Sequence, residues 1–152
     1  MTNATADARN RLAILSSTGF FGGLSNSQLE QISALCELQE RGEGEQIYRV
    51  GEPARVVYVV VRGMVRLAVG YGERSASGGN VLRRGDVFGW AALTPACNQR
   101  IATASCMSAC SLLTIDGASL LGLMERDHTL GYRLMSQLNR LITSTLSAFA
   151  GG

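Results

Sequence analysis

The stretch that decides the fold runs from Gly85 to Ala104 and reads Gly-Asp-Val-Phe-Gly-Trp-Ala-Ala-Leu-Thr-Pro-Ala-Cys-Asn-Gln-Arg-Ile-Ala-Thr-Ala. Short β-strand patterns flank it, and the small residues 91–93 can form one helical turn before Pro95. Backbone N–H groups at the start of such a turn, with Arg100 opposite, suit a single negative charge such as a phosphate. The alternative is a barrel corner with a surface arginine, because glycine-rich turns are common in β-proteins.

Length and composition indicate one globular unit. The chain has 152 residues, of which 46% are hydrophobic and 17% charged, a balance typical of a folded domain. A net charge of +2 is too small to predict a nucleic-acid surface. The N-terminus lacks a signal-peptide pattern, and no apolar run approaches the roughly 20 residues of a membrane span. We therefore expect a cytoplasmic protein without direct contact to nucleic acid or membrane.

The middle of the chain has the pattern of a β-roll. Apolar and β-branched residues alternate or run together in short segments, at residues 46–50, 56–61, 64–69, 81–82, 101–107 and 111–115. Eighteen glycines against two prolines supply frequent turns, and the Gly/Ser-rich residues 70–79 predict a flexible hairpin loop. Seven or eight short strands with such turn signals are typical of a closed roll.

Helical periodicity appears at both ends of the chain. It predicts four helices, at residues 6–16, 26–36, 118–126 and 128–149. Ser25 and Gln28 form a capping box at the start of the second helix. Asp116 and Asp127 are the predicted N-caps of the last two helices.

The last helix carries an apolar stripe at three- and four-residue steps, formed by Leu130, Leu134, Leu138, Leu141, Ile142 and Leu146. Such a stripe fits either packing on the barrel or the seam of a two-helix dimer. We expect a homodimer through residues 128–149, because the preceding helix can already cover the barrel. The alternative is a monomer with this helix folded back.

The metal-ligating residue types are few and scattered. The cysteines show no Cys-x-x-Cys pair, and His128 is the only histidine, so we expect no metal and no resident cofactor. Cys106 and Cys110 straddle a predicted turn and could approach each other. In a reducing cytoplasm, we expect all four cysteines (Cys36, Cys97, Cys106 and Cys110) to be buried free thiols.

The order of these elements resembles the cyclic-nucleotide-binding domain of the catabolite activator and fumarate–nitrate regulator (Crp/Fnr) superfamily. The resemblance covers about residues 20–150 and rests on Gly51-Glu52-Pro53-Ala54, on Gly63 between strands, and on residues 85–89 and 100–104. It implies a mainly β fold, namely a double-stranded β-helix (jelly-roll) barrel with N-terminal helices and two C-terminal helices.

The same resemblance implies a division of the chain into three parts. We expect an N-terminal tail and helix at 1–19, a cyclic-nucleotide-binding-like β-roll at 20–127, and a dimerisation-type helix at 128–152. Transcription factors of the superfamily append a helix-turn-helix domain, and residues 1–152 have neither the composition nor the length for one. Direct DNA binding is therefore not expected, although the sensor part of a longer transcription regulator would look the same.

The resemblance also implies a ligand site. In the superfamily a phosphate-binding cassette lies between Phe-Gly-Glu, whose glutamate takes the ribose 2′-hydroxyl, and Arg-Ser/Thr-Ala, whose arginine pairs with the cyclic phosphate. Arg100 matches this arginine, whereas Trp90 replaces the glutamate and Ile101 replaces the Ser/Thr. The implied ligand-binding residues are Phe88, Gly89, Trp90, Ala91, Ala92, Arg100, Ile101 and Thr145.

Two of these positions leave alternatives open. The indole of Trp90 could stack on a base or sugar, or it could fill the pocket and close it. Thr145 matches a position from which some superfamily members reach the adenine, but as a residue of an amphipathic helix it is expected to be exposed.

Three classes of function follow from this pattern. The first is a sensor that binds cAMP, cGMP or another small anion at Arg100 and signals through its last helix. The second is a degenerate domain kept as a dimerisation or protein-interaction scaffold, which the apolar residues Trp90 and Ile101 favour. The third, an enzyme, is not expected, because no metal-ligand set, Ser-His-Asp set or carboxylate pair is visible in the sequence.

Overall fold

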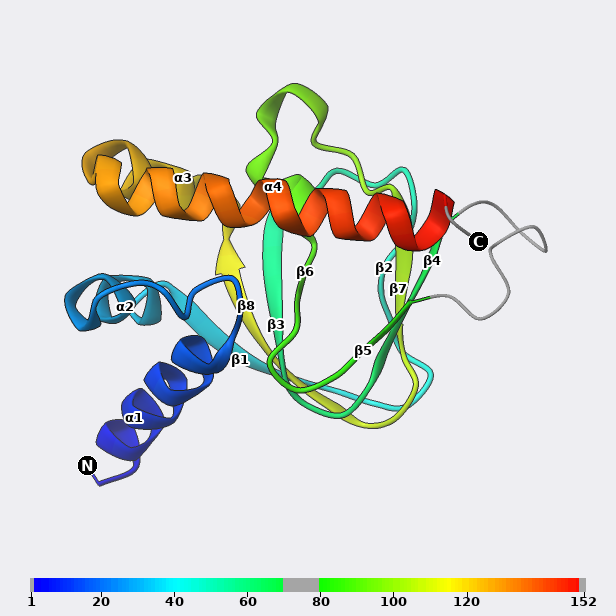
Figure 1. Ribbon diagram of the computed structural model, residues 1–152. Helices are drawn as coiled ribbons and strands as arrows, with labels where there is room; N and C mark the ends of the chain where they lie inside the picture. Colours follow the sequence, from blue (N-terminus) through cyan, green and yellow to red (C-terminus); the bar gives the residue numbers. More distant parts are fainter. Residues whose placement is uncertain (1, 70–79, 151–152) are drawn as a thin grey trace.

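The computed structural model describes residues 2–69 and 80–150, so the predicted loop at 70–79 lies outside the described part (Figure 1). The helices are α1 (Thr2–Ser17), α2 (Asn26–Ser33), α3 (Gly117–Arg126) and α4 (His128–Ala150). The strands are β1 (Cys36–Arg41), β2 (Gln46–Tyr48), β3 (Val56–Arg62), β4 (Val65–Val69), β5 (Asn80–Leu82), β6 (Val87–Phe88), β7 (Ala102–Cys106) and β8 (Cys110–Asp116). Two short 3-10 turns, η2 (Trp90–Leu93) and η3 (Pro95–Cys97), follow β6.

The strands form two antiparallel sheets of four strands each. One sheet has the order β1-β8-β3-β6 and the other β2-β7-β4-β5. Each of the steps β1–β2, β3–β4, β5–β6 and β7–β8 crosses from one sheet to the other, which winds the chain into a roll. The predicted mainly β jelly roll with helices at both ends is therefore confirmed.

Strand β3 separates two hydrophobic cores. Its alternating side chains point to opposite faces, so that Val57 and Val59 join a core under the helices while Tyr58 and Val60 point into the roll. Because both faces are buried, the strand reads as a continuous apolar run rather than an alternating one.

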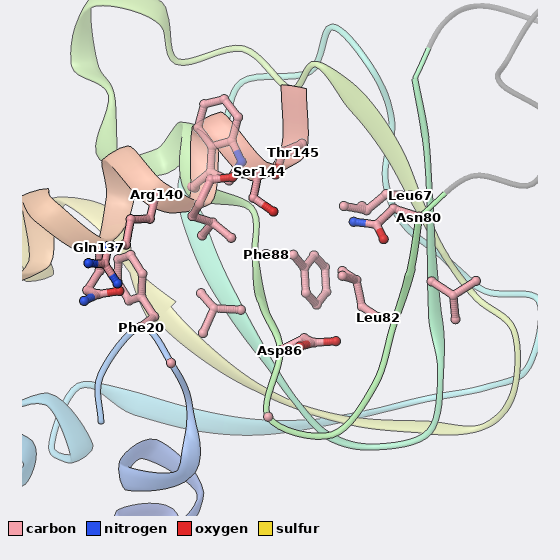
Figure 2. Close-up of a pocket in the computed structure, with 16 residues that line it drawn as sticks. Phe20, Leu67, Asn80, Leu82, Asp86, Phe88, Gln137, Arg140, Ser144 and Thr145 are labelled. Atoms are coloured by element: carbon pink, nitrogen blue, oxygen red, sulfur yellow. Dashed lines mark hydrogen bonds between the residues drawn. The ribbon is translucent and has the colours of Figure 1, made fainter. Parts of the chain in front are cut away.

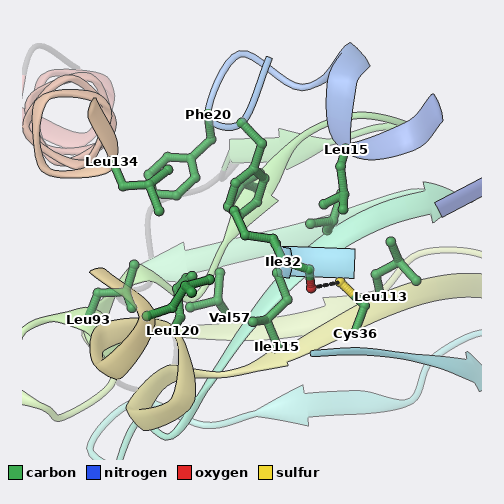
Figure 3. Packing of buried hydrophobic residues seen from close by; sticks show 14 of the residues in the cluster. Leu15, Phe20, Ile32, Cys36, Val57, Leu93, Leu113, Ile115, Leu120 and Leu134 are labelled. Carbon is green, nitrogen blue, oxygen red and sulfur yellow. Dashed lines mark hydrogen bonds between the residues drawn. The ribbon is translucent and has the colours of Figure 1, made fainter. Parts of the chain in front are cut away.

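We call the core under the helices the helix-side core. Figure 3 shows how the four helices contribute to it against the β1-β8-β3-β6 sheet. Its largest fully buried members are Leu15, Phe21, Ile32, Leu93, Leu113, Ile115, Leu120, Leu130, Leu134 and Val57. The second core, the barrel interior, contains Tyr48, Tyr58, Val60, Val65, Leu67, Leu82, Phe88, Ala102, Ala104, Cys106, Cys110 and Leu112.

The predicted second helix is too long. It ends at Ser33 rather than Cys36, and Cys36–Arg41 forms β1, which pairs with β8 along its whole length. The sequence of β1, Cys-Glu-Leu-Gln-Glu-Arg, buries only its first residue fully, so it lacks the apolar alternation that announces a strand. Main-chain pairing to β8 decides the conformation here.

The apolar stripe of α4 packs on the chain's own core. Leu130, Leu134 and Leu138 are at most 4% exposed and belong to the helix-side core, so this part of the stripe packs on the roll, as the monomer alternative predicted, and the homodimer stays a prediction. Among the α4 side chains that the structure describes, the large exposed apolar ones are Tyr132 and Met135. Within the described residues, no helix is both long and apolar enough to cross a membrane.

The predicted helix caps are confirmed. Ser25 and Gln28 bond reciprocally at the start of α2. The Asp116 carboxylate accepts a hydrogen bond from the Ser119 N–H at 2.9 Å. The Asp127 carboxylate accepts one from the Leu130 N–H at 3.1 Å and so fixes the start of α4.

Candidate functional site

The candidate site lies at the turn between β6 and η2. Gly89 follows β6 in a left-handed conformation, with a φ of 80°, and redirects the chain into the 3-10 turn that starts at Trp90. The Thr94 hydroxyl closes the turn by donating to the Ala91 carbonyl at 2.8 Å. The predicted single helical turn before Pro95 is therefore confirmed, with 3-10 rather than α geometry.

Arg100 points into the roll and is only 5% exposed. Its Nη1 donates to the Gly89 carbonyl at 2.9 Å and its Nη2 to the Val56 carbonyl at 2.8 Å. The guanidinium carbon lies 4.1 Å from the centre of the Tyr48 ring, a cation–π contact. The alternative of a surface arginine is therefore wrong.

In the described part of the chain, no carboxylate lies within salt-bridge distance of Arg100, although the more distant Glu52 acts on its charge. The arginine forms no salt bridge there, and its buried Nε donates to no group. Burial lowers the pKa of Arg100 and raises the pKa of the neighbouring Tyr48. Buried charges in proteins are normally paired, so this guanidinium is a ready partner for an anion.

Gly89 makes room for the guanidinium. A Cβ atom at this position would lie 3.0 Å from Nη1 of Arg100 and 3.1 Å from the Val56 carbonyl oxygen. The absence of a side chain therefore serves both the left-handed turn and the close approach of Arg100.

Two cavities adjoin this turn. A small one of about 20 Å³ is lined by Tyr48, Leu67, Gly89, Trp90, Ala91, Arg100, Ile101, Ala102 and Thr145. A larger one of about 370 Å³ lies between α4 and the strands β4, β5 and β6 (Figure 2). Leu67, Trp90 and Thr145 line both, so the two spaces share a wall.

The structure brings most of the predicted ligand residues together at these two cavities. Phe88 lines the larger cavity, and Ile101, 36% exposed, lies at the edge of the smaller one. Ala92 lines neither cavity. It lies against the start of α3, where a Cβ on Gly117 would be 2.6 Å from the Ala92 carbonyl oxygen.

Thr145 is buried rather than exposed, contrary to what its helical position alone indicated. It is 8% exposed, and its hydroxyl donates to the Leu141 carbonyl at 2.8 Å. The reason is that the last turns of α4 lie over the opening of the roll (Figure 1), so a threonine on that face is enclosed.

Several lining residues were not predicted. Gln137, Arg140 and Ser144 line the larger cavity from α4, and Asn80 lines it from β5. In Figure 2, Gln137 and Arg140 lie beside Phe20, whereas Asn80 lies at the opposite end with Leu67. The three- and four-residue spacing of the α4 positions was visible in the sequence, but it marks a shared face only once Thr145 is known to point inward.

No cysteine lines either cavity in the described part of the chain. All four are free, with Cys36, Cys106 and Cys110 buried, whereas Cys97 is exposed and corrects the expectation that all would be buried. Burial raises the pKa of Cys36 and that of Cys106 to about 12. These two thiols are therefore protonated and unreactive at neutral pH.

Similar solved structures agree with the fold. The sensor domain of the transcriptional regulator DNR from Pseudomonas aeruginosa is 21% identical, with a TM-score of 0.73 and coverage of 95% of this chain and 93% of that one. The regulatory domain of Toxoplasma gondii PKA, solved with cAMP, is 20% identical with a TM-score of 0.74, covering 97% and 52%. The catabolite activator protein of Thermus thermophilus is 22% identical with a TM-score of 0.68, covering 86% and 61%. At these identities the likeness shows the fold alone.

Two sequence comparisons indicate the family of this chain. A Rhodopseudomonas palustris protein whose name proposes a potassium channel is 28% identical over 116 residues, which are 75% of this chain. The match spans 27% of the length of that protein. Residues 38–127, more than half of the chain, match the family model of the cyclic nucleotide-binding domain. This chain, with its jelly roll, therefore belongs to the cyclic nucleotide-binding domain family.

Proposed function

We propose that this chain is a sensor domain that binds a cyclic nucleotide, cAMP or cGMP, with the cyclic phosphate at Arg100. The observation that carries the proposal is the buried guanidinium without a carboxylate partner in the described residues. An anion at this place would supply the missing counter-charge. It would also give the unpartnered Nε an acceptor.

The remainder of the nucleotide fits the larger cavity. Its volume of about 370 Å³ lies within the range of small-molecule sites. The wall combines apolar side chains such as Leu82 and Phe88 with polar groups on α4, a mixture suited to a base. Because Trp90 and Thr145 stand between this cavity and Arg100, we expect them to move when the phosphate enters.

Signalling would start at the Gly89 carbonyl. A phosphate that takes Nη1 of Arg100 releases this carbonyl, and the 3-10 turn η2 that follows it packs against β3, α3 and α4. The ligand would thus shift the population of α3 and α4 arrangements. The exposed Tyr132 and Met135 on α4 are the surface we propose for a homodimer through 128–149 or for a downstream partner.

A scaffold without ligand is the second candidate, and one observation favours it. Only about 20 Å³ is open beside Arg100, and both of its Nη atoms already bond to backbone carbonyls. In this case Trp90 closes the site permanently and α4 serves protein contacts alone. Both candidates involve binding without catalysis, and for both we propose a cytoplasmic protein without direct DNA or membrane contact.

Calorimetric titration of cAMP and cGMP, followed in parallel by fluorescence of the single tryptophan Trp90, separates the two candidates. For a sensor we expect micromolar binding that Arg100→Gln weakens at least about tenfold, because charged hydrogen bonds are lost. Arg9→Ala, which removes an exposed arginine on α1, should bind as the wild type does. Absence of heat and of fluorescence change at millimolar nucleotide would establish the scaffold instead.

A further inference from the structure

Trp90 occupies the wall between the two cavities. It is half-buried, opens the turn η2, and lines both the small space at Arg100 and the larger space under α4. Any ligand that reaches from one space into the other must therefore pass the wall that Trp90 forms with Leu67 and Thr145. The side chain at this position contributes a large apolar surface and no acceptor for a hydroxyl group.

Among the described residues, neither cavity is lined by a buried carboxylate. Asp86 is the acidic residue in either lining, and its Oδ2 accepts the Arg83 N–H at 2.8 Å within the β5–β6 turn. The hydroxyl of Thr145, the buried polar group on the α4 side, donates to its own helix at Leu141. Because the Thr145 hydroxyl already has the Leu141 carbonyl as its acceptor, the loss of a ligand hydroxyl leaves its proton paired.

The other polar side chains that line the larger cavity are open to water, whereas the buried Tyr48 lines the small cavity beside Arg100. Ser144 is exposed, and Asn80 and Gln137 are half-exposed. A hydrogen bond from such a group to a ligand hydroxyl replaces a bond to water, so its loss changes affinity little. Strong rejection of an analogue that lacks a hydroxyl requires a buried polar partner that would be left unpaired.

The apolar part of the lining is aromatic at three places. Phe20, Phe88 and Trp90 reach the larger cavity from three separate elements of the chain. Planar rings bind well between such side chains. Arg100, behind the shared wall, supplies the positive charge.

We infer that the site recognises a planar aromatic ring that carries one anionic group, that Trp90 is the specificity-determining residue, and that a sugar hydroxyl is not required. The inference rests on the proposed function, because it concerns the ligand of that same site. It adds that the ring and the anion, rather than the ribose, determine the affinity.

Three probes test the inference on the full chain: cAMP, 2′-deoxy-cAMP, and ribose 3′,5′-cyclic phosphate without a base. We expect dissociation constants of cAMP and 2′-deoxy-cAMP within about threefold of each other, since no buried group is left unpaired. The probe without a base should bind about tenfold to a hundredfold more weakly, which is the range for loss of one stacked base.

Two variants assign the effect to Trp90. Trp90→Leu should bring cAMP close to the affinity of the probe without a base, whereas Trp90→Phe should retain most of the ring's contribution. Circular-dichroism melting of both variants checks that they fold, and Trp90→Phe remains informative if Trp90→Leu does not. Equal affinity of Trp90→Leu and wild type for cAMP would overturn the role of Trp90.

The probes distinguish failure of this inference from failure of the proposed function. If cAMP binds at Arg100 but 2′-deoxy-cAMP binds more than tenfold more weakly, the hydroxyl is recognised and the inference is wrong while the sensor stands. If none of the three probes binds at millimolar concentration, the inference and the nucleotide sensor are overturned together.

Discussion

The helix-side core and the barrel interior are built from the same strand β3, yet they differ in kind. The helix-side core contains apolar side chains from all four helices. The barrel interior holds a set of rings, with Tyr58 and Phe88 stacked at 5.0 Å between centroids, and the unpaired cation Arg100 lies over Tyr48. Burial of apolar side chains stabilises the fold. A buried charge without an ion-pair partner instead lowers the stability of the fold. The contrast indicates that the helix-side core supplies folding stability, whereas the barrel interior holds the proposed binding site.

The largest expected effect tests the helix-side core. Phe21 is fully buried there and meets Phe20 edge-to-face, with 4.8 Å between ring centroids. Phe21→Ala should lower the free energy of unfolding by about 3–5 kcal/mol, because it removes buried area and leaves a cavity. Urea denaturation followed by circular dichroism measures this change.

An exposed apolar residue gives the matched control for that experiment. Replacement of Met107, which is 41% exposed and directly follows β7, by alanine should lower the free energy of unfolding by less than about 0.5 kcal/mol, as for other surface changes. Similar losses for Phe21→Ala and Met107→Ala would contradict the assignment of folding stability to the helix-side core.

An intermediate effect is expected at the turn that holds Arg100, where two glycines form a natural pair. Gly89 and Gly44 have φ values of 80° and 81°, but a Cβ at Gly44 would meet nothing within 4 Å, whereas one at Gly89 would press on Arg100. Gly44→Ala should lower the free energy of unfolding by about 1–2 kcal/mol, because alanine is strained in the left-handed backbone conformation. Gly89→Ala should cost more, since the guanidinium must also shift, and it should weaken nucleotide binding.

The same urea titrations measure both glycine variants, with cAMP titrations alongside. If the two variants lose the same free energy of unfolding and bind cAMP equally well, the close approach of Gly89 to Arg100 contributes nothing to stability or binding. The barrel interior would then differ from the helix-side core in composition only.

Much of the fold could be predicted from the spacing of turn residues, apolar residues and capping residues along the sequence. Turn residues between short apolar runs predicted the roll, and the capping residues Ser25, Asp116 and Asp127 predicted three of the four helix starts. Strand β1 was missed because its polar residues adopt their conformation through pairing with β8. The sequence did not decide what the α4 stripe packs against, because leucine spacing is the same whether the partner is the chain's own sheet or a second copy.

The candidate site was less predictable. Its position followed from the family resemblance, but the environment of Arg100 did not, since its partners are the backbone carbonyls of Gly89 and Val56, the latter 44 positions earlier. Because every residue has a backbone carbonyl, the sequence does not indicate which of them accepts a hydrogen bond from Arg100. The burial of Thr145 likewise depends on where α4 ends its path over the roll, which is a property of tertiary packing rather than of helical periodicity.

The smallest effect is expected at Asp127, which fixes the start of the helix that links the two regions. Hydrogen bonds from the Leu130 N–H and then from the Gln28 amide lower the pKa of Asp127. A carboxylate with a lowered folded-state pKa adds stability above its unfolded pKa of about 3.9, and this stability is lost as the pH falls through the folded value. Asp127→Asn keeps a capping oxygen, so we expect near wild-type stability at pH 7 and a flatter dependence of the unfolding free energy on pH below about 4. Urea titrations from pH 7 to pH 2.5 measure this slope, and an unchanged slope would show that α4 owes its start to the leucines of the helix-side core rather than to the charged cap.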